Sequence, residues 1–213
     1  MKINNLDHPI TTQSFAIIDQ EIGEHNVTNA EYAIIRRVIH STADFEFTQL
    51  IQFSPGAIAG AITSLQKGTP IITDVNMVKQ GISSMVKKTF NNPILSAIDH
   101  AQKPLPGKTR TETGLLQLWE QYPQAIYAIG NAPTALITLC QQLNITSPKP
   151  ALVIGAPVGF VSVLESKQAL EATSVAKIMI KGRKGGSPAT AAIVNALLVL
   201  AWEECSAPQD NQK

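Results

Sequence analysis

The chain has 213 residues, of which 44% are hydrophobic and 15% are charged. This length suffices for one sizeable hydrophobic core. The formal net charge of +1 gives the protein no overall positive potential. This argues against binding to nucleic acid or to a membrane surface. Because soluble domains usually carry about 25% charged residues, the low charged fraction predicts surface buried between subunits, and therefore an oligomer.

One domain is predicted over residues 1–206, followed by a polar tail at residues 207–213. The N-terminus lacks an apolar signal core. The most apolar stretch, residues 187–202, has the length of a buried helix and contains polar residues, so no membrane span is predicted. The expected location is the cytoplasm.

The first third of the chain carries helical patterns. Apolar residues recur at helical spacing over residues 15–22, with Thr11 or Thr12 as the cap. A second helix is expected over residues 30–39 and a third over residues 56–66. The N-terminal third is therefore predicted to be mainly helical.

From residue 69 onward, short apolar runs alternate with helical segments. The predicted strands are residues 70–74, 125–129, 151–154 and 176–180, and the clearest helices are residues 134–143, 161–172 and 188–204. This alternation predicts a three-layer α/β/α fold with a parallel sheet. Residues 91–113, rich in Pro, Lys and Thr, are expected to form a long surface connection.

His40 lies at or just past the end of the second predicted helix, and two hydroxyl residues and an acid follow it. An imidazole can gain or lose a proton near neutral pH, so His40 is a candidate acid–base group. In such a window alone, a core or capping histidine is the commoner finding. Asp44 could orient His40 or cap a helix. The four histidines of the chain lack metal-ligand spacing, so no metal site is predicted.

Three of the predicted strands are followed by glycine-led loops. The candidate ligand-binding residues in these loops are Gly130, Asn131, Gly159, Arg183, Lys184, Gly185, Gly186 and Ser187. Ligands of parallel sheets bind outside the carboxyl ends of the strands, where glycine lets backbone amides approach them. We therefore expect a large anionic ligand at this edge. The standard phosphate-binding and hydrolase motifs are absent from the sequence.

Several short motifs, taken together, resemble one known family. They are Ser14-Phe15-Ala16-Ile17-Ile18, Val38-Ile39-His40, Asp74-Val75-Asn76-Met77-Val78, Thr109-Arg110-Thr111, Gly130-Asn131-Ala132-Pro133-Thr134, Pro157-Val158-Gly159-Phe160-Val161, Glu165-Ser166-Lys167 and the run from Gly182 to Ser187. In this order they resemble the precorrin-8X methylmutases, also called cobalt-precorrin-8 methylmutases. The resemblance covers about residues 14–197 and is specific, because many unrelated motifs coincide.

The resemblance implies a homodimeric α/β isomerase of cobalamin synthesis that needs no external cofactor. Its tetrapyrrole substrate would be precorrin-8X or cobalt-precorrin-8, in which a methyl group moves from C-11 to C-12 to give hydrogenobyrinate or cobyrinate. The family's catalytic histidine falls on His40, and a substrate-binding serine falls on Ser14. We add Arg110 and the glycine-led loops as groups that would meet the substrate carboxylates. Family members differ at Lys184.

Two alternatives stay open at this point. The first is a non-catalytic tetrapyrrole-binding or carrier protein of the same fold, and the intact His40 argues against it. The second is a phosphate-ester or nucleotide enzyme that uses the loop at residues 182–187, and the missing phosphate motifs argue against it. Whether the tetrapyrrole carries cobalt is not decided by the sequence.

Overall fold

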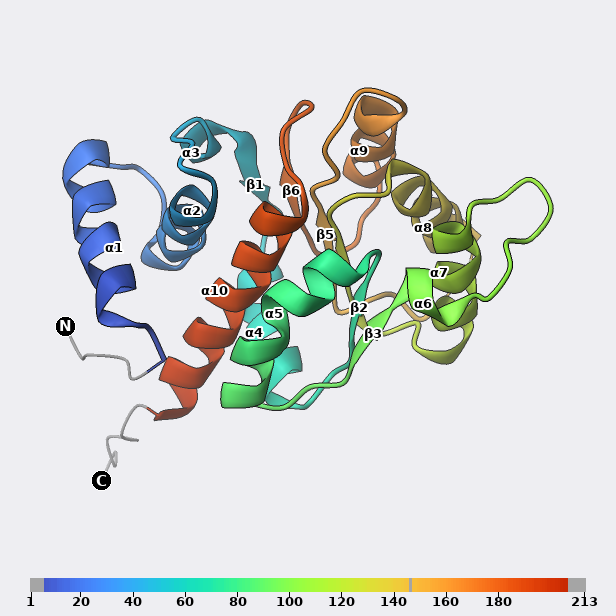
Figure 1. Cartoon of the computed structure of the whole chain (residues 1–213), viewed down its shortest axis with the longest axis horizontal. Coiled ribbons are helices and arrows are strands. Elements are labelled where there is room, and N and C mark those ends of the chain that lie inside the picture. The colour runs from blue at the N-terminus through green and yellow to red at the C-terminus, as the bar shows by residue number, and fades with distance from the viewer. Residues whose placement is uncertain (1–5, 146, 207–213) are drawn as a thin grey trace.

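The computed structural model describes residues 6–145 and 147–206, so the tail expected at residues 207–213 lies outside the described residues. Its sheet has the strand order β1-β6-β5-β4-β2-β3 (Figure 1). The strands are β1 (Ile51–Phe53), β2 (Ile71–Thr73), β3 (Ile94–Ser96), β4 (Ile126–Ile129), β5 (Leu152–Gly155) and β6 (Lys177–Ile180). All neighbouring strands run parallel except β1, which pairs antiparallel with β6.

Helices cover both faces of this sheet. The first layer holds α1 (Pro9–Ile22), α2 (Asn29–Thr42), α3 (Phe47–Leu50), α4 (Ala57–Gln66), α5 (Asn76–Lys88) and α10 (Ser187–Ser206). The second layer holds α6 (Ala97–His100), α7 (Arg110–Gln121), α8 (Pro133–Ile145) and α9 (Val163–Glu171). The predicted three-layer α/β/α architecture and the helical N-terminal third are confirmed.

The strands belong to two hydrophobic cores at once. In β4, Ile126 and Ala128 join the core of the first layer, whereas Tyr127 and Ile129 join the core of the second layer. This alternation follows from the two-residue period of a strand. Because both faces are covered, the strands read as continuous apolar runs, which is the pattern that reveals them in the sequence.

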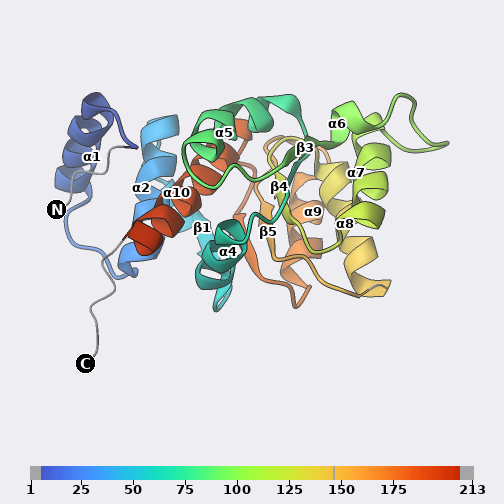
Figure 2. The ribbon, with the colours of Figure 1, turned by 90° about the horizontal axis from the view of Figure 1, so that it is seen from below.

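Helix α10 is the central helix of the first layer and contacts α2, α4 and α5 (Figure 2). Among the described residues it is the helix whose length and apolarity would suit a membrane span. Its apolar residues are, however, mostly buried against the neighbouring helices and the sheet. Its composition is thus explained by its place in the core.

The sequence prediction missed several elements. The segment expected to be a long surface connection contains β3, α6 and the start of α7. Strand β1 and helix α5 were not predicted either. The missed strands are only three residues long and partly exposed, whereas the equally short β2 was found because all three of its residues are buried.

Two predicted helix boundaries also differ from the structure. Helix α1 begins at Pro9, and His8, rather than a threonine, caps it through a 3.2 Å hydrogen bond from the Ile10 N–H. A proline suits the first helical position because its missing N–H would have no helical partner there. Helix α2 starts after Thr28 and continues to Thr42, so His40 lies within its last turn.

Candidate active site

His40 is exposed in the last turn of α2, and its ring meets Phe15 of α1 edge to face, with 5.5 Å between ring centroids. A capping box between Thr28 and Glu31 begins α2 and fixes the direction of the helix that carries His40. The exposed imidazole is open to a ligand, while its contact with Phe15 restricts the orientation of the ring.

Two arginine side chains of α2 pack against the Phe15 ring. The guanidinium carbon of Arg36 lies 4.4 Å from the centroid of the Phe15 ring, and that of Arg37 lies 5.3 Å from it. Ion pairs of 2.8 Å, from Arg36 to Asp19 and from Arg37 to Asp7, hold α2 against the N-terminal segment. These contacts join α1 and α2 into one support for His40.

Ser14 precedes Phe15 on α1 and is half-buried. Its hydroxyl donates a 2.9 Å hydrogen bond to the carbonyl oxygen of Ile10, one turn earlier in the same helix. The hydroxyl proton is therefore engaged within the helix, and the Ser14 oxygen is left to accept a hydrogen bond from a ligand.

Asp74, directly after β2, is buried and organises the loop that follows β4. Its carboxylate accepts hydrogen bonds from the N–H groups of Val75 at 3.0 Å, Gly130 at 3.1 Å, Asn131 at 2.6 Å and Ala132 at 2.7 Å. Burial raises the pKa of the Asp74 carboxyl, and these four donors oppose that effect. Strands β2 and β4 are neighbours whose connections leave in opposite directions, which is the usual place of a ligand crevice.

These bonds change the role of Gly130 and Asn131. Their amides, expected to face a ligand, donate to Asp74 instead. A Cβ atom on Gly130 would lie 2.6 Å from the Thr190 hydroxyl oxygen, so this glycine permits close packing of the loop against α10. The exposed side chain of Asn131 is the group that this loop can still offer to a ligand.

The loops after β5 and β6 are joined through their backbones. The Gly159 N–H donates to the Arg183 carbonyl at 3.2 Å, and the Gly186 N–H donates to the Ala156 carbonyl at 2.8 Å. A Cβ atom on Gly185 would lie only 2.2 Å from the Ala156 oxygen. The glycines of these loops therefore serve loop-to-loop contact, and ligand anions have to be met mainly by side chains.

Lys167 of α9 was not predicted as a site residue, yet it supports the loop between β6 and α10. Its buried ammonium group donates to the carbonyl oxygens of Gly182 at 2.7 Å and Lys184 at 2.8 Å. Burial lowers the pKa of Lys167 to about 8. A usable signal was present in the sequence, because Lys167 shares a helical stripe with the apolar Val163 and Leu170.

Lys184 connects the loop between β6 and α10 to the segment that follows His40. Its ammonium nitrogen lies 2.6 Å from a carboxylate oxygen of Asp44 and 3.0 Å from one of Glu46. The hydrogen bond from Lys184 holds the pKa of the Asp44 carboxyl below its usual value. Asp44 also accepts from the Glu46 N–H at 3.0 Å, so its contacts are with Lys184 and this turn. The ion pair between Lys184 and Asp44 thereby connects the segment after α2 to the edge of the sheet.

The structure does not gather all the predicted residues in one place. Arg110 is exposed at the first position of α7, at the opposite end of the molecule from α1 and α2 (Figures 1 and 2). Ser187 begins α10 and is buried. Arg183 is exposed beside Lys184 and remains open to a ligand.

Three apolar side chains stand open to solvent next to this basic loop. Phe160 and Val161, both between β5 and α9, are 84% and 83% exposed, and Val158 is 43% exposed. A γ-carbon of Val158 would lie 3.5 Å from a Cβ atom on Gly186, which places this apolar segment against the loop between β6 and α10. Exposed apolar groups beside cationic ones suit a ligand with an apolar body and acidic substituents.

Comparisons with known proteins agree on one family. The family model for precorrin-8X methylmutase matches residues 9–200. The chain belongs to the precorrin-8X methylmutase family. A cobalt-precorrin-8 methylmutase of Synechocystis sp. is 56% identical over 213 residues, covering 93% of this chain and 98% of the relative. A precorrin-8X methylmutase of Sinorhizobium sp. is 38% identical, covering 88% of this chain and 92% of the relative.

A solved structure gives the same answer for the fold. The crystal structure of precorrin-8X methylmutase from Thermus thermophilus superposes with a TM-score of 0.84 at 38% identity, covering 92% of this chain and 99% of that chain. As a methylmutase, the chain is an isomerase of cobalamin biosynthesis. Membership of this family supports neither of the two alternatives, the non-catalytic tetrapyrrole carrier and the phosphate-ester or nucleotide enzyme.

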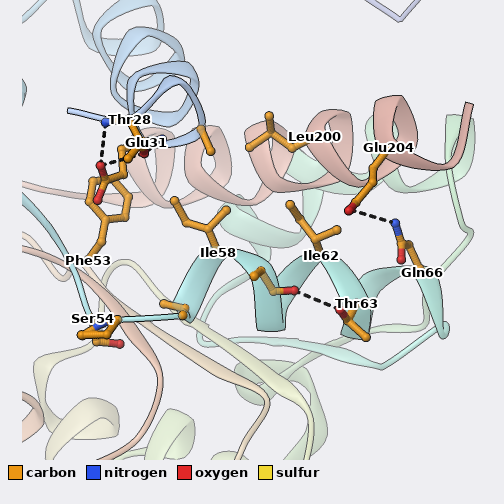
Figure 3. Close-up of a pocket in the computed structure, with 15 residues that line it drawn as sticks. Thr28, Glu31, Phe53, Ser54, Ile58, Ile62, Thr63, Gln66, Leu200 and Glu204 are labelled. Carbon is orange, nitrogen blue, oxygen red and sulfur yellow. Dashed lines mark hydrogen bonds between the residues drawn. The ribbon is translucent and has the colours of Figure 1, made fainter. Parts of the chain in front are cut away.

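A groove of about 620 Å³ lies elsewhere on this methylmutase (Figure 3). It runs between α4 and the later part of α10, where Ile58, Ile62 and Leu200 point toward it. Glu204 at its end accepts a 3.4 Å hydrogen bond from the side-chain amide of Gln66. The predicted site residues are not among the residues that line it, so it is separate from the edge described above.

We searched the described residues for side chains that could bind a metal ion. Within residues 6–145 and 147–206, no three His, Cys, Asp or Glu side chains form a group able to hold a metal ion. The side chains that the described site offers are the exposed imidazole of His40, the exposed guanidinium of Arg183 and the apolar Phe160 and Val161.

Proposed function

We propose that this chain moves a methyl group from C-11 to C-12 of precorrin-8X or cobalt-precorrin-8, giving hydrogenobyrinate or cobyrinate. The observation that carries the proposal is the family match over residues 9–200, with His40 intact and exposed at the end of α2. The relatives named above divide between the metal-free and the cobalt substrate. The 56% identity favours the cobalt form.

His40 acts as the proton-transfer group in this proposal. It protonates a pyrrolic position near the migrating methyl group, which polarises the conjugated ring and favours the shift. It takes the proton back after migration, so the reaction balances as an isomerisation without an external cofactor. A positioned acid–base group typically contributes about 10² to 10⁴-fold in rate. The contact with Phe15 keeps the imidazole in one orientation.

The substrate is held by side chains rather than by free glycine amides. Arg183 and Lys184 meet its carboxylates, and the Ser14 oxygen accepts a hydrogen bond from it. Phe160 and Val161 lie against the apolar face of the macrocycle, which explains their exposure in the isolated chain. The predicted Gly185, Gly186 and Ser187 contribute by shaping the loop, alongside Gly130, Asn131 and Gly159.

We also propose a cytoplasmic homodimer in which residues 1–206 form a single domain. The low charged fraction of 15% and the exposed apolar side chains outside the site, such as Ile10, Ile17 and Met77, support buried subunit surface. Helix α7, which begins at Arg110, lies at the opposite end of the molecule from α2, which carries His40, so a role of Arg110 in binding would require the second subunit to bring its copy to the site. Sedimentation equilibrium at micromolar protein concentration tests the dimer.

The decisive experiment follows the absorption spectrum of the tetrapyrrole, with and without cobalt, on mixing with purified protein. Conversion to the corrin spectrum by wild type, with a rate at least about 100-fold lower for His40→Ala, is expected. The matched control is His100→Ala, since His100 is an exposed histidine in α6 on the second layer. Equal rates for both variants would rule out proton transfer by His40. Binding of the tetrapyrrole without conversion by wild type would favour the carrier protein.

A further inference from the structure

Lys167 is a buried lysine without an acidic partner. Only 4% of the residue is exposed, and among the ion pairs of the described chain none involves it. An ammonium group in such a place is costly in free energy unless strong hydrogen bonds compensate for the lost water. Two backbone carbonyl oxygens, of Gly182 and Lys184, supply those bonds.

These bonds belong to a continuous series that holds one turn of the loop between β6 and α10. The carbonyls of Gly182 and Lys184 accept from the Lys167 ammonium, and the carbonyl of Arg183 between them accepts from the Gly159 N–H. Three consecutive carbonyl groups are thus anchored to residues 159–167. The backbone on both sides of Arg183 is fixed, while its side chain is free in solvent.

The anchored turn carries the two basic side chains that face outward at this edge. Arg183 is exposed, and Lys184 reaches toward Asp44 and Glu46 beyond α2. Gly182 has a φ of +68°, a left-handed conformation that lets the chain turn sharply into this pair. Without the ammonium group, two carbonyl oxygens lose their charged donor and the turn gains alternative conformations.

We propose that Lys167 is a positioning residue for the methylmutase reaction, whose ammonium group fixes the 182–184 turn so that Arg183 and Lys184 meet the substrate carboxylates in set directions. This inference rests on the proposed function. The contacts of Arg183 and Lys184 with the carboxylates are taken to be equally strong in the ground state and the transition state, and the loss of such uniform binding raises KM more than it lowers kcat.

The test compares steady-state kinetics of wild type and Lys167→Met, which keeps an unbranched side chain one atom shorter and removes its charge. We expect KM for the tetrapyrrole to rise about tenfold, with kcat changed by less than about threefold. The matched control is Lys177→Met. Lys177 also donates to two backbone carbonyls, those of Glu171 and Thr173, but at the start of β6, away from the loop. Its KM stays at the wild-type value.

A double-mutant cycle separates positioning from a general loss of structure. In an Arg183→Ala/Lys184→Ala background, Lys167→Met leaves KM unchanged, because the side chains that it positions are gone. The same tenfold rise in this background would overturn the proposal. Lys167→Gln, which keeps N–H donors without the charge, gives an intermediate KM and preserves the comparison if the Met variant does not fold.

The outcomes distinguish this role from the proposed function itself. An unchanged KM in Lys167→Met, or a loss of kcat alone, would overturn the role of Lys167 while the wild type still converts the tetrapyrrole. Absence of conversion by the wild type with either form of the substrate would overturn the proposed function, and the positioning role with it.

Discussion

Two loops at the same edge of the sheet are organised by buried groups of opposite charge. The loop after β4 is built on the Asp74 carboxylate, which accepts from the backbone amides of residues 130–132. The loop after β6 is built on the Lys167 ammonium, which donates to the backbone carbonyls of Gly182 and Lys184. The first loop has therefore used its anion-binding amides, whereas the second displays Arg183 to solvent and holds the half-buried Lys184 against Asp44 and Glu46.

The difference between the two loops indicates where a polycarboxylate binds. Glycine-led loops after parallel strands suggest free amides, but here a buried side chain satisfies the backbone of each loop first. Anionic ligands then bind to the loop after β6, which the buried Lys167 ammonium organises, because the basic side chains of that loop reach the surface. The loop around Asp74 supplies rigidity next to this site, since a fully satisfied buried network fixes one conformation.

The largest effect is expected from Asp74→Asn. The amide group would replace one acceptor oxygen and leave two buried N–H groups facing another donor, at a loss of about 4 kcal/mol in the free energy of unfolding. Urea unfolding measures it. Asp99→Asn is the control, because Asp99 is exposed and accepts one hydrogen bond, from Asn76, at 2.7 Å. It should change stability by less than about 0.5 kcal/mol, and similar losses in both variants would contradict the central role of Asp74.

Substituting the glycines of the second loop should show an intermediate effect. Gly185→Ala places a Cβ atom 2.2 Å from the Ala156 oxygen, so we expect a loss of about 3 kcal/mol from steric overlap and backbone strain. Gly182→Ala is the matched comparison: Gly182 also has a positive φ, but nothing lies within 4 Å of its Cβ position. A loss of about 1 kcal/mol is expected there. Equal losses by thermal or urea unfolding would show that the two loops do not approach closely.

A smaller effect concerns pH. The pKa of Lys167 falls from 10.5 to about 8 on folding, because burial disfavours the ammonium form. Between these values the unfolded chain binds more protons, so the stability of wild type rises with pH. Relative to Lys167→Met, we expect a gain of about 2 kcal/mol in the free energy of unfolding from about pH 7.5 to about pH 9.5. A stability difference independent of pH would mean that the amine is well hydrated.

Helices and strands could be predicted from the sequence where apolar patterns are long or repeated. They were missed where the apolar run is short and isolated. Strands β4, β5 and β6, with four buried or mostly buried residues each, were found because they alternate with clear helical segments, whereas β1 was hidden between α3 and α4. Helix α7 was detectable from Thr109 and Glu112, whose capping box is visible as a Thr-x-x-Glu pattern.

The candidate site was predictable in its side chains but not in its backbone. His40, Ser14 and Arg183 stand out by residue type or family motif and are accessible in the structure. The engagement of the Gly130 and Asn131 amides depends on a contact with Asp74, 56 and 57 residues away in the chain. Such long-range hydrogen bonds leave no local pattern, and only the folded chain shows which donors are already used.

The position of α10 also affects the order in which the residues of the two hydrophobic cores are translated. The core of the second layer draws its residues from Ile72 to Met179, so all of them are translated before α10. The core of the first layer lacks its central helix until residues 187–201 emerge. Helix α2, which carries His40, is therefore translated long before α10, the helix against which it packs.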